Sequence, residues 1–315
     1  MRRLALSLLV VALASPAWAA TRTWDGGGAD ALATTAANWS SDIAPVAGDD
    51  VVFDATSTKA CTWDLSSGVT LGSFSINAGA QAITVNSSIN ISGAYSQASG
   101  TVTFNTGSPV ITAGASSTIS GGTITHSQEP NGSGTTAARA VSFNVAGNLN
   151  FSGGSITVAA LGFVVSQGPA TAPTSGAIGS GGANGGDGGA SGESTPGTSG
   201  IGSIVAPVTA GSGGGQHTCC SSVGGKGGGT VKLVVTGTLT VGGSISANGG
   251  NGTSFGGGGA GGSIWISAGT LAGSGAITAN GGTGAGGGGG GGKIALTYTT
   301  RTHNGTTSAY GGSGN

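Results

Sequence analysis

The chain has 315 residues, of which 70 are glycine and only 6% are charged. Ordinary soluble domains carry roughly 25% charged residues. Nine Lys and Arg residues stand against ten Asp and Glu residues, so the chain lacks the positive excess that binds nucleic acid or anionic lipid. This composition excludes a nucleic-acid-binding function and favours an extracellular protein whose solubility depends on Ser, Thr, Asn and exposed backbone.

The first residues have the pattern of an export signal. Arg2 and Arg3 precede an apolar run over residues 4–14, and Ala17-Trp18-Ala19 supplies a small-x-small cleavage pattern. The apolar run is shorter than the roughly 20 residues that a transmembrane helix needs, and no later run approaches that length. We therefore predict a signal peptide over residues 1–19, a secreted or cell-surface location, and no transmembrane segment in the mature chain.

Residues 20–160 predict a series of short strands. Val, Ile, Thr and Phe alternate with polar residues in short runs that Gly, Asn or Ser bound, which is the usual strand-and-turn pattern. The clearest runs cover residues 69–76, 83–85, 89–91, 102–104 and 119–124. Outside the signal, no segment shows a capped period of 3.6 residues. The mature chain is therefore predicted to be all β.

A motif then repeats after 32 residues: GTLTVGGSISANGG at 237–250 recurs as GTLAGSGAITANGG at 269–282. A strand-like run precedes each copy, and a third such run covers residues 293–298. A similar unit begins earlier in the chain, at Val141. Such a unit buries its apolar face only when it stacks on neighbours. We predict a β-solenoid of the parallel β-helix type, in which Leu239 and Leu271, and likewise Ile245 and Ile277, occupy equivalent inward positions.

Glycine is concentrated in the second half, and it reaches seven in a row at residues 286–292. Each Gly in a strand interior costs roughly 0.5–1 kcal/mol relative to Ala, so these runs indicate either flexible loops or extended backbone packed against backbone. Flexibility is the favoured interpretation for residues 168–228. We divide the mature chain into a strand-repeat region, a Gly-rich loop or insertion, Gly-rich repeats and a flexible tail: 20–160, 161–229, 230–300 and 301–315.

Several motifs resemble those of bacterial autotransporter-like, Gly-rich β-strand-repeat surface proteins. They are TWDGGG at 23–28, AANWS at 36–40, GDDVVF at 48–53, ISGAYSQ at 91–97 and the GGSIWI block from Gly261. The resemblance implies an exported β-helix of the adhesin type, often part of a longer surface polypeptide. No translocator, sorting signal or anchor is recognisable after Tyr298, so we expect either a further domain or release of the protein.

Cys61, Cys219 and Cys220 can form at most one disulfide, which leaves one thiol over. His217 lies close to the last two cysteines, but three ligands within four residues do not match the separated ligand pairs of tetrahedral zinc sites. We therefore predict no metal site. One disulfide among the three cysteines is possible, and the adjacent pair Cys219-Cys220 is one of the possible pairings.

The acidic cluster Asp49, Asp50 and Asp54 resembles the carboxylates of a pectin-degrading hydrolase. Adjacent residues of a strand point to opposite faces, and an inverting pair must flank one bond, so we interpret the cluster as a polar turn. The histidines and basic residues are scattered, and the glycine run before Lys293 lacks the Ser or Thr of a phosphate-binding loop. We predict no catalytic residue and no cofactor.

Four tryptophans, Trp24, Trp39, Trp63 and Trp265, can stack on sugar rings. Three of them lie near the start of the mature chain, where bulky residues can cap the end of a solenoid and prevent edge pairing. Capping is the preferred interpretation for these three, with a glycan platform as the alternative.

The sequence thus predicts adhesion or a structural scaffold, with cell-surface glycans or other copies of the chain as partners. One alternative is a secreted carbohydrate-active β-helix enzyme, either a polysaccharide lyase or a glycoside hydrolase. Another is an ice-binding protein, because Thr101-Val102-Thr103 and Thr123-Ile124-Thr125 lie 22 residues apart, about one solenoid turn.

Overall fold

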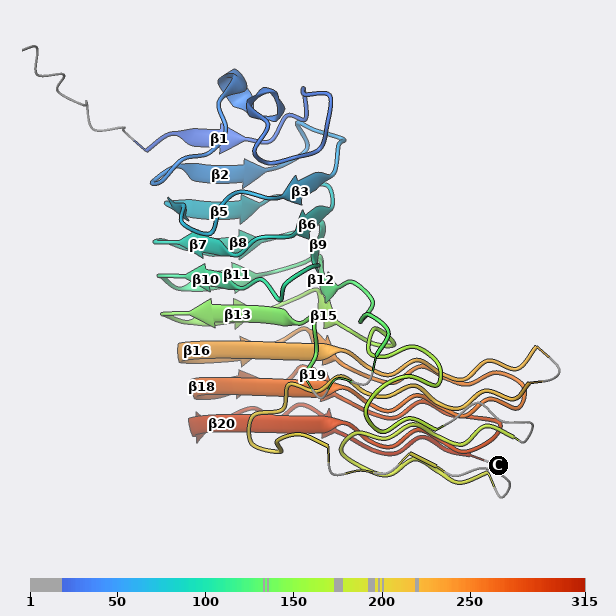
Figure 1. Ribbon diagram of the computed structural model, residues 1–315. Coiled ribbons are helices and arrows are strands. Elements are labelled where there is room, and N and C mark those ends of the chain that lie inside the picture. The colour runs from blue at the N-terminus through green and yellow to red at the C-terminus, as the bar shows by residue number, and fades with distance from the viewer. Residues whose placement is uncertain are drawn as a thin grey trace, which may run out of the picture.

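A computed structural model describes residues 19–314 except 133, 135, 173–177, 192–195, 198, 200, 219 and 220. Residues 1–18 of the predicted signal peptide and the Cys219-Cys220 pair therefore lie outside the described residues. Within them the fold is an all-β parallel solenoid, as predicted, with two short 3₁₀ helices (Ala36–Asn38 and Ser40–Asp42) near its start. Figure 1 shows the coils stacked from the N-terminal end downwards, with long glycine-rich segments projecting from one side of the lower coils.

Each coil has three faces. The first face begins with β1 (Thr21–Thr23), β2 (Asp50–Phe53), β5 (Ser73–Ile76), β8 (Tyr95–Gln97), β11 (Ser117–Ile119) and β14 (Leu149–Phe151). The second face is the eight-stranded sheet of β3 (Cys61–Trp63), β6 (Ile83–Val85), β9 (Thr101–Phe104), β12 (Thr123–His126), β15 (Ser155–Thr157), β17 (Ser244–Ser246), β19 (Ala276–Thr278) and β21 (Thr307–Ser308). The third face begins with β4 (Thr70–Leu71), β7 (Ile89–Ile91), β10 (Ile111–Ala113) and β13 (Val141–Val145).

Three long strands complete the first and third faces: β16 (Thr230–Val241), β18 (Ser263–Gly273) and β20 (Lys293–Arg301). The first half of β16 pairs with β13 and its second half with β14. Leu239 pairs with Leu271 and Ile245 with Ile277, all fully buried, so the predicted register is confirmed. Within residues 301–315, which we predict to be a flexible tail, β21 continues the second face beside β19.

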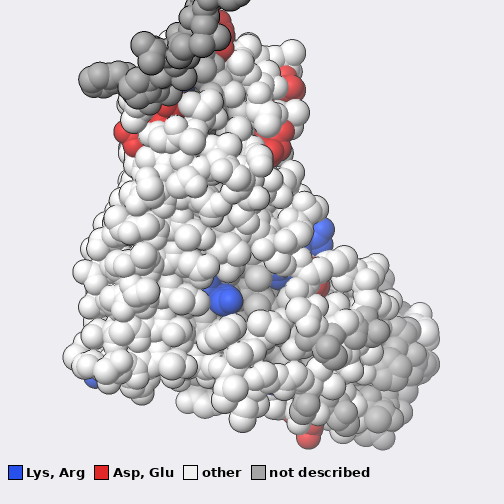
Figure 2. All heavy atoms as spheres, turned by 60° about the vertical axis from the view of Figure 1, so that its left-hand side comes forward, with Lys and Arg blue, Asp and Glu red and all other residues white. Residues whose placement is uncertain are grey.

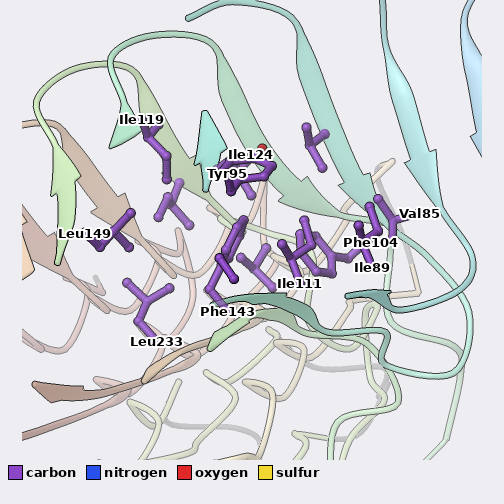
Figure 3. Close-up of a cluster of buried hydrophobic side chains, with 14 of the residues drawn as sticks. Val85, Ile89, Tyr95, Phe104, Ile111, Ile119, Ile124, Phe143, Leu149 and Leu233 are labelled. Carbon is purple, nitrogen blue, oxygen red and sulfur yellow. The ribbon is translucent and has the colours of Figure 1, made fainter. Parts of the chain in front are cut away.

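The core is a column of inward side chains that alternate with outward polar residues, as strand geometry requires. Figure 3 shows Tyr95, Phe104 and Phe143 meeting within it, among aliphatic residues from successive coils. The ring centroids of Tyr95 and Phe143 lie 5.3 Å apart, and those of Phe104 and Phe143 lie 5.6 Å apart. These contacts join all three faces, since the rings come from β8, β9 and β13.

The glycine-rich segments leave the solenoid between the second and third faces and pack into one body, here called the glycine bundle. Its described segments are 161–168, 179–189, 209–215, 224–229, 247–252, 256–262, 279–284, 286–292 and 309–314. Figure 1 shows them running side by side as extended, wavy traces. The flexible loops favoured for this region are therefore a wrong prediction for its described residues, and the alternative of backbone packed against backbone is confirmed.

Hydrogen bonds in segment 256–262 follow a period of three residues. Its N–H groups donate in turn to three neighbouring segments: to 211–215 from Gly257 and Ala260, to 286–292 from Gly258 and Gly261, and to 247–252 from Gly259 and Gly262. A three-residue period without hydrogen bonds inside the segment is the repeat of a polyproline II helix. Segment 256–262 therefore satisfies these backbone N–H groups through its neighbours rather than within itself.

Glycine is required in this bundle because the backbones lie too close for side chains. A Cβ added to Gly258 would overlap the carbonyl oxygen of Gly282, and one added to Gly261 would overlap that of Ala279. Crowding that only glycine tolerates is also what fixes the glycine period of collagen. The long glycine runs are therefore a packing requirement of the fold.

His126, at the end of β12, joins the bundle to the solenoid. The ring is buried, its Nδ1 donates to the Ser127 carbonyl at 2.7 Å, and its Nε2 accepts from the Thr230 N–H at 3.1 Å. Thr230 opens β16, where the chain re-enters the solenoid after the 161–229 insertion. Burial, together with the nearby Arg139 charge, lowers the pKa of His126 to about 4, against a hydrogen bond to Ser127 that raises it. The neutral ring is therefore the form that fits this junction.

We expect Leu271→Ala to lower the free energy of unfolding by about 2–5 kcal/mol, because it removes a fully buried side chain from the stacked core. Ser267→Ala, on the outward side of the same strand, is the control and should change the stability by less than about 0.5 kcal/mol. Denaturant unfolding of both variants measures the difference. Equal midpoints for the two variants would contradict the inward position of Leu271.

Gly258→Ala should destabilise the bundle by about 1–3 kcal/mol, the usual cost of forcing extra atoms into a packed interior. Gly311→Ala is the matched control, because an added Cβ there meets only the Gly289 carbonyl oxygen, at an ordinary 3.6 Å. Hydrogen exchange of the bundle amides, measured with the unfolding midpoint, shows whether the effect is local. Protection that is unchanged in Gly258→Ala would mean that the bundle is not packed as described.

Stability should fall as the pH is lowered from about 6.5 to about 4. Above this window His126 is neutral in both the folded and the unfolded chain. Within it, His126 binds a proton in the unfolded chain but stays neutral in the folded chain, and this difference lowers the free energy of unfolding by up to about 3 kcal/mol. His126→Gln keeps a hydrogen-bond acceptor without a titrating ring and should lack this component. Unfolding measured at several pH values in both proteins isolates it, and parallel pH profiles would refute the role given to His126.

Candidate functional site

The outward side of the second face carries a column of hydroxyl residues along successive coils, here called the hydroxyl face. The main column contains Thr62, Thr84, Thr103, Thr125, Thr157, Ser246 and Thr278. A shorter column beside it contains Thr101, Thr123, Ser155 and Ser244 and ends at Ala276. All of these side chains are partly or fully exposed, so the columns form one continuous polar surface.

Strand geometry fixes the spacing of this array. Neighbouring strands lie about 4.7–4.9 Å apart, and side chains two residues apart along a strand are separated by about 6.6 Å. The inward partners of the array are buried aliphatic residues such as Val102, Ile124 and Ile156. Because a register shift of one residue would expose this apolar set, core packing holds the hydroxyl columns in place.

Most of these hydroxyl groups are available to a ligand. Thr123 Oγ1 lies 3.4 Å from Ser155 Oγ, and Thr125 Oγ1 donates to the His126 carbonyl at 3.4 Å. Within the described chain, no hydrogen bond engages the hydroxyls of Thr62, Thr84, Thr103, Thr157 and Thr278. Each of these groups can therefore both donate and accept outwards.

The polar surface continues from the second face onto the glycine bundle. Segments 247–252, 279–284 and 309–314 follow directly after β17, β19 and β21 and hydrogen-bond side by side. Their outward positions carry two short rows, Asn248–Asn280–Tyr310 and Asn251–Thr283–Ser313. Side-chain oxygens tie the layers together: Asn248 Oδ1 accepts from the Asn280 N–H at 2.7 Å, and Asn280 Oδ1 accepts from the Tyr310 N–H at 2.9 Å. The array is thus extended by residues with the same neutral, hydrogen-bonding character.

Three of the four predicted sugar-stacking tryptophans are in the core. Trp24, Trp39 and Trp63 are each at most 2% exposed. The Trp39 ring stacks edge-on to the other two, with centroids at 5.2 and 6.3 Å. They pack at the N-terminal end, which is the position that the capping interpretation gives them, and their buried rings present no accessible face to a sugar in this structure.

Trp265 lies elsewhere, on the outward side of β18 in the third face. It is partly exposed, and the Lys232 ammonium sits 4.6 Å from the centroid of its ring. Such a cation–π contact fixes both side chains on the surface. The sugar-stacking hypothesis for Trp265 stays a prediction.

The acidic cluster near the start of the chain is structural. Asp49 is buried and forms an ion pair with Arg22 at 2.9 Å, while its carboxylate also accepts from the Ala20 and Val46 N–H groups. Burial raises the pKa of Asp49, but these hydrogen bonds and the Arg22 charge outweigh it and hold the pKa below its usual value. Asp50 accepts from the Ser73 hydroxyl at 2.6 Å, and Asp54 accepts from the Thr56 N–H. The polar-turn interpretation fits this arrangement.

Cys61 is a buried free thiol in β3. Burial, with a smaller contribution from the nearby Asp64, raises its pKa well above the ordinary value, so the unreactive thiol form is favoured. His217 lies in the bundle with its ring 5.8 Å from that of Phe255. In the part of the chain that the structure describes, no three His, Cys, Asp or Glu side chains gather as metal ligands.

Sequence reasoning found only the Thr101–Thr103 and Thr123–Thr125 portion of the hydroxyl face. The equal 22-residue spacing of those motifs was the signal. Thr62 and Thr84 share that spacing, but the other members lie in coils of different lengths, and the insertion of residues 161–229 separates Thr157 from Ser246. Aligning the inward apolar residue that precedes each outward hydroxyl (Cys61 in β3, and Ile or Val in the later strands), rather than counting a fixed period, would have found the whole column.

None of the described helices has the length and apolar character required to cross a membrane. Comparisons with protein-family models, with curated proteins and with solved structures gave no match for this chain. The function must therefore be argued from the geometry of the molecule itself.

Proposed function

We propose that the protein is exported and acts outside the cell as a non-catalytic adhesion or scaffold protein, with the hydroxyl face as its binding surface. The observation that carries this proposal is the stacking of outward hydroxyl groups on seven successive strands of one parallel sheet, most of them without a hydrogen bond to the described residues. The export pattern at residues 1–19, the resemblance to autotransporter-like surface proteins and the low charge of the chain support it.

A rigid array of this kind suits a ligand that is itself repetitive. Each neutral hydrogen bond contributes only about 0.5–1.5 kcal/mol net, so one or two such bonds give only a weak binding affinity. Many bonds made at once from a prearranged sheet add up, because little conformational entropy is lost on binding. The face carries no charged side chain in its two columns, which favours a neutral surface. The ordered surface of an uncharged polysaccharide meets these requirements.

The register of the two columns favours ice as a second candidate. Thr101 stacks on Thr123, and Thr103 stacks on Thr125, so methyl and hydroxyl groups recur at a fixed spacing in two dimensions. A surface of this kind can order water as well as sugar hydroxyls. The face itself therefore does not separate the two ligands, and the experiment below includes both.

An enzymatic function has less support. Asp49, the most buried carboxylate of the acidic cluster, is occupied by Arg22 and two backbone N–H groups. Catalytic carboxylates must instead reach a bond of the substrate from positions roughly 5–9.5 Å apart. We therefore assign these residues to the N-terminal turn and not to polysaccharide hydrolysis or lysis.

Self-association is part of the same proposal. Among the described residues, β20 pairs only with β18, so one edge of this nine-residue strand is open within the chain. Open strand edges can pair with another chain. Sedimentation of the purified protein over a range of concentrations tests this component separately from surface binding.

Thr125→Tyr should weaken binding to an insoluble neutral polysaccharide about tenfold or more. A bulky ring in the centre of the array holds the ligand away from the neighbouring hydroxyl groups, and the lost contacts correspond to about 1.4 kcal/mol or more of binding free energy. Thr118→Tyr is the control, since Thr118 is exposed on the first face. Cosedimentation of both variants with cellulose and with chitin measures the effect.

The same two variants, assayed for ice adsorption and for inhibition of ice growth, decide between the candidate ligands. Loss of ice adsorption in Thr125→Tyr alone, without polysaccharide binding in the parent protein, would favour the second candidate. Equal losses in Thr125→Tyr and Thr118→Tyr would remove the hydroxyl face from the proposal. Cleavage of a polysaccharide that Asp49→Ala or Asp50→Ala abolishes would replace adhesion by an enzymatic function.

A further inference from the structure

A pocket of about 240 Å³ lies at the edge of the third face, outside the hydroxyl face. Its floor is formed by Ser142 of β13 and by Thr230 and Lys232 of β16, and its walls by Ser108, Val110, Thr136, Ala137, Ala140 and Val208. Two hydrogen bonds hold the walls together: the Ala137 N–H donates to Val208 at 2.8 Å, and Ser108 Oγ donates to Ala138 at 2.9 Å. The pocket is therefore built from four separate chain segments that are fixed to one another.

At this pocket, two hydroxyl groups lack hydrogen-bond partners within the described chain, and one ammonium group lacks an ion-pair partner among the described carboxylates. Thr230 is 1% exposed, and its Oγ1 is buried without a hydrogen bond. Ser142 is 6% exposed, and its hydroxyl forms no hydrogen bond with described residues. The Lys232 ammonium contacts the Trp265 ring and forms no ion pair with the described carboxylates. A buried hydroxyl without a partner costs about 1–3 kcal/mol, so a bound ligand is the natural partner for these groups.

The charge around the pocket favours an anion with a single negative charge. Figure 2 shows basic atoms at mid-height of this side of the molecule, while most of the acidic atoms lie near the N-terminal end. Lys232 is the one charged residue that lines the pocket. A phosphate dianion is usually held by several charged or backbone donors, often by the planar fork of Arg. One ammonium group balances one carboxylate.

The remaining lining fits a sugar ring. Val110, Ala137, Ala140 and Val208 offer apolar walls for the C–H faces of a pyranose, and Ser142 and Thr230 offer hydroxyls to its polar edge. Pockets for drug-sized molecules measure about 300–1,000 Å³, so this smaller volume corresponds to one sugar residue.

We propose that this pocket binds one uronic acid residue, free or within an acidic polysaccharide, with its carboxylate on Lys232 and its hydroxyls on Ser142 and Thr230. The site is on a different face from the hydroxyl columns and does not depend on the function proposed for them. It gives the protein a second, charge-dependent contact with extracellular glycans.

Calorimetric titration of the purified protein with galacturonate and with glucuronate at low salt tests the proposal, with galactose, glucose and inorganic phosphate as comparison ligands. We expect a uronate to bind at least about tenfold more tightly than its neutral sugar, the ratio that one hydrogen bond to a charged group supplies. Lys232→Gln should weaken uronate binding by at least about tenfold, and Thr230→Val by a smaller factor. Lys226→Gln, an exposed lysine of the bundle, should leave it unchanged.

Trp265 provides an independent readout, because it touches Lys232 whereas Trp24, Trp39 and Trp63 are buried in the cap. Uronate should change the tryptophan fluorescence of the parent protein and of Lys226→Gln, but not that of Trp265→Phe. If Lys232→Gln fails to fold, Thr230→Val and Trp265→Phe still decide the outcome. Equal affinity for neutral sugars, preference for phosphate, or no binding of either uronate would each overturn the assignment.

Discussion

Backbone hydrogen bonding between parallel coils is the interaction on which the rest of this structure depends. The solenoid sets successive strands at one interstrand spacing, and each second-face strand from β15 onwards (β15, β17, β19 and β21) leads directly into a segment of the glycine bundle. The bundle segments therefore begin at a separation that their own backbones can bridge. With no room for a Cβ between them, glycine becomes obligatory where Gly258 and Gly261 face neighbouring carbonyl groups. The spacing of the bundle segments is therefore set by the spacing of the solenoid strands that precede them.

The two halves of the molecule are stabilised in different ways. In the N-terminal coils, aromatic and aliphatic side chains fill the interior, from the tryptophan cap to the Tyr95–Phe143 contact. In the bundle, backbone packs on backbone, and little apolar area is available to offset the conformational entropy that ordered glycine loses. His126 lies where these two regions meet, and its ring accepts the hydrogen bond from the Thr230 N–H at the point where the chain leaves the bundle. The bundle also extends the hydroxyl face past the ends of the second-face strands, through Asn248 after β17 and Asn280 after β19.

The two proposed binding surfaces use opposite chemistry. The hydroxyl face is long, neutral and repetitive, so its affinity would come from many weak bonds made together. The pocket at Lys232 is small and charged, and it combines the Lys232 ammonium with two hydroxyl groups that have no hydrogen-bond partner among the described residues. A protein with both surfaces could hold a neutral solid surface through one face and an acidic glycan chain through another. Both roles are proposed from geometry and charge, and the resemblance to autotransporter-like surface proteins supports only the first of them.

The all-β solenoid and the pairing of Leu239 with Leu271 could be predicted from the sequence, because inward aliphatic residues recur at a period that strand stacking requires. The cap of Trp24, Trp39 and Trp63 could also be predicted from its position. The order of the glycine runs could not, since a glycine segment carries no side-chain pattern and its hydrogen-bond partners lie in other segments. The full hydroxyl column was likewise hidden by unequal coil lengths. The sequence by itself determined which residues face inwards; only the tertiary structure decided which outward residues become neighbours, because that depends on how far each insertion travels before the chain returns to the next coil.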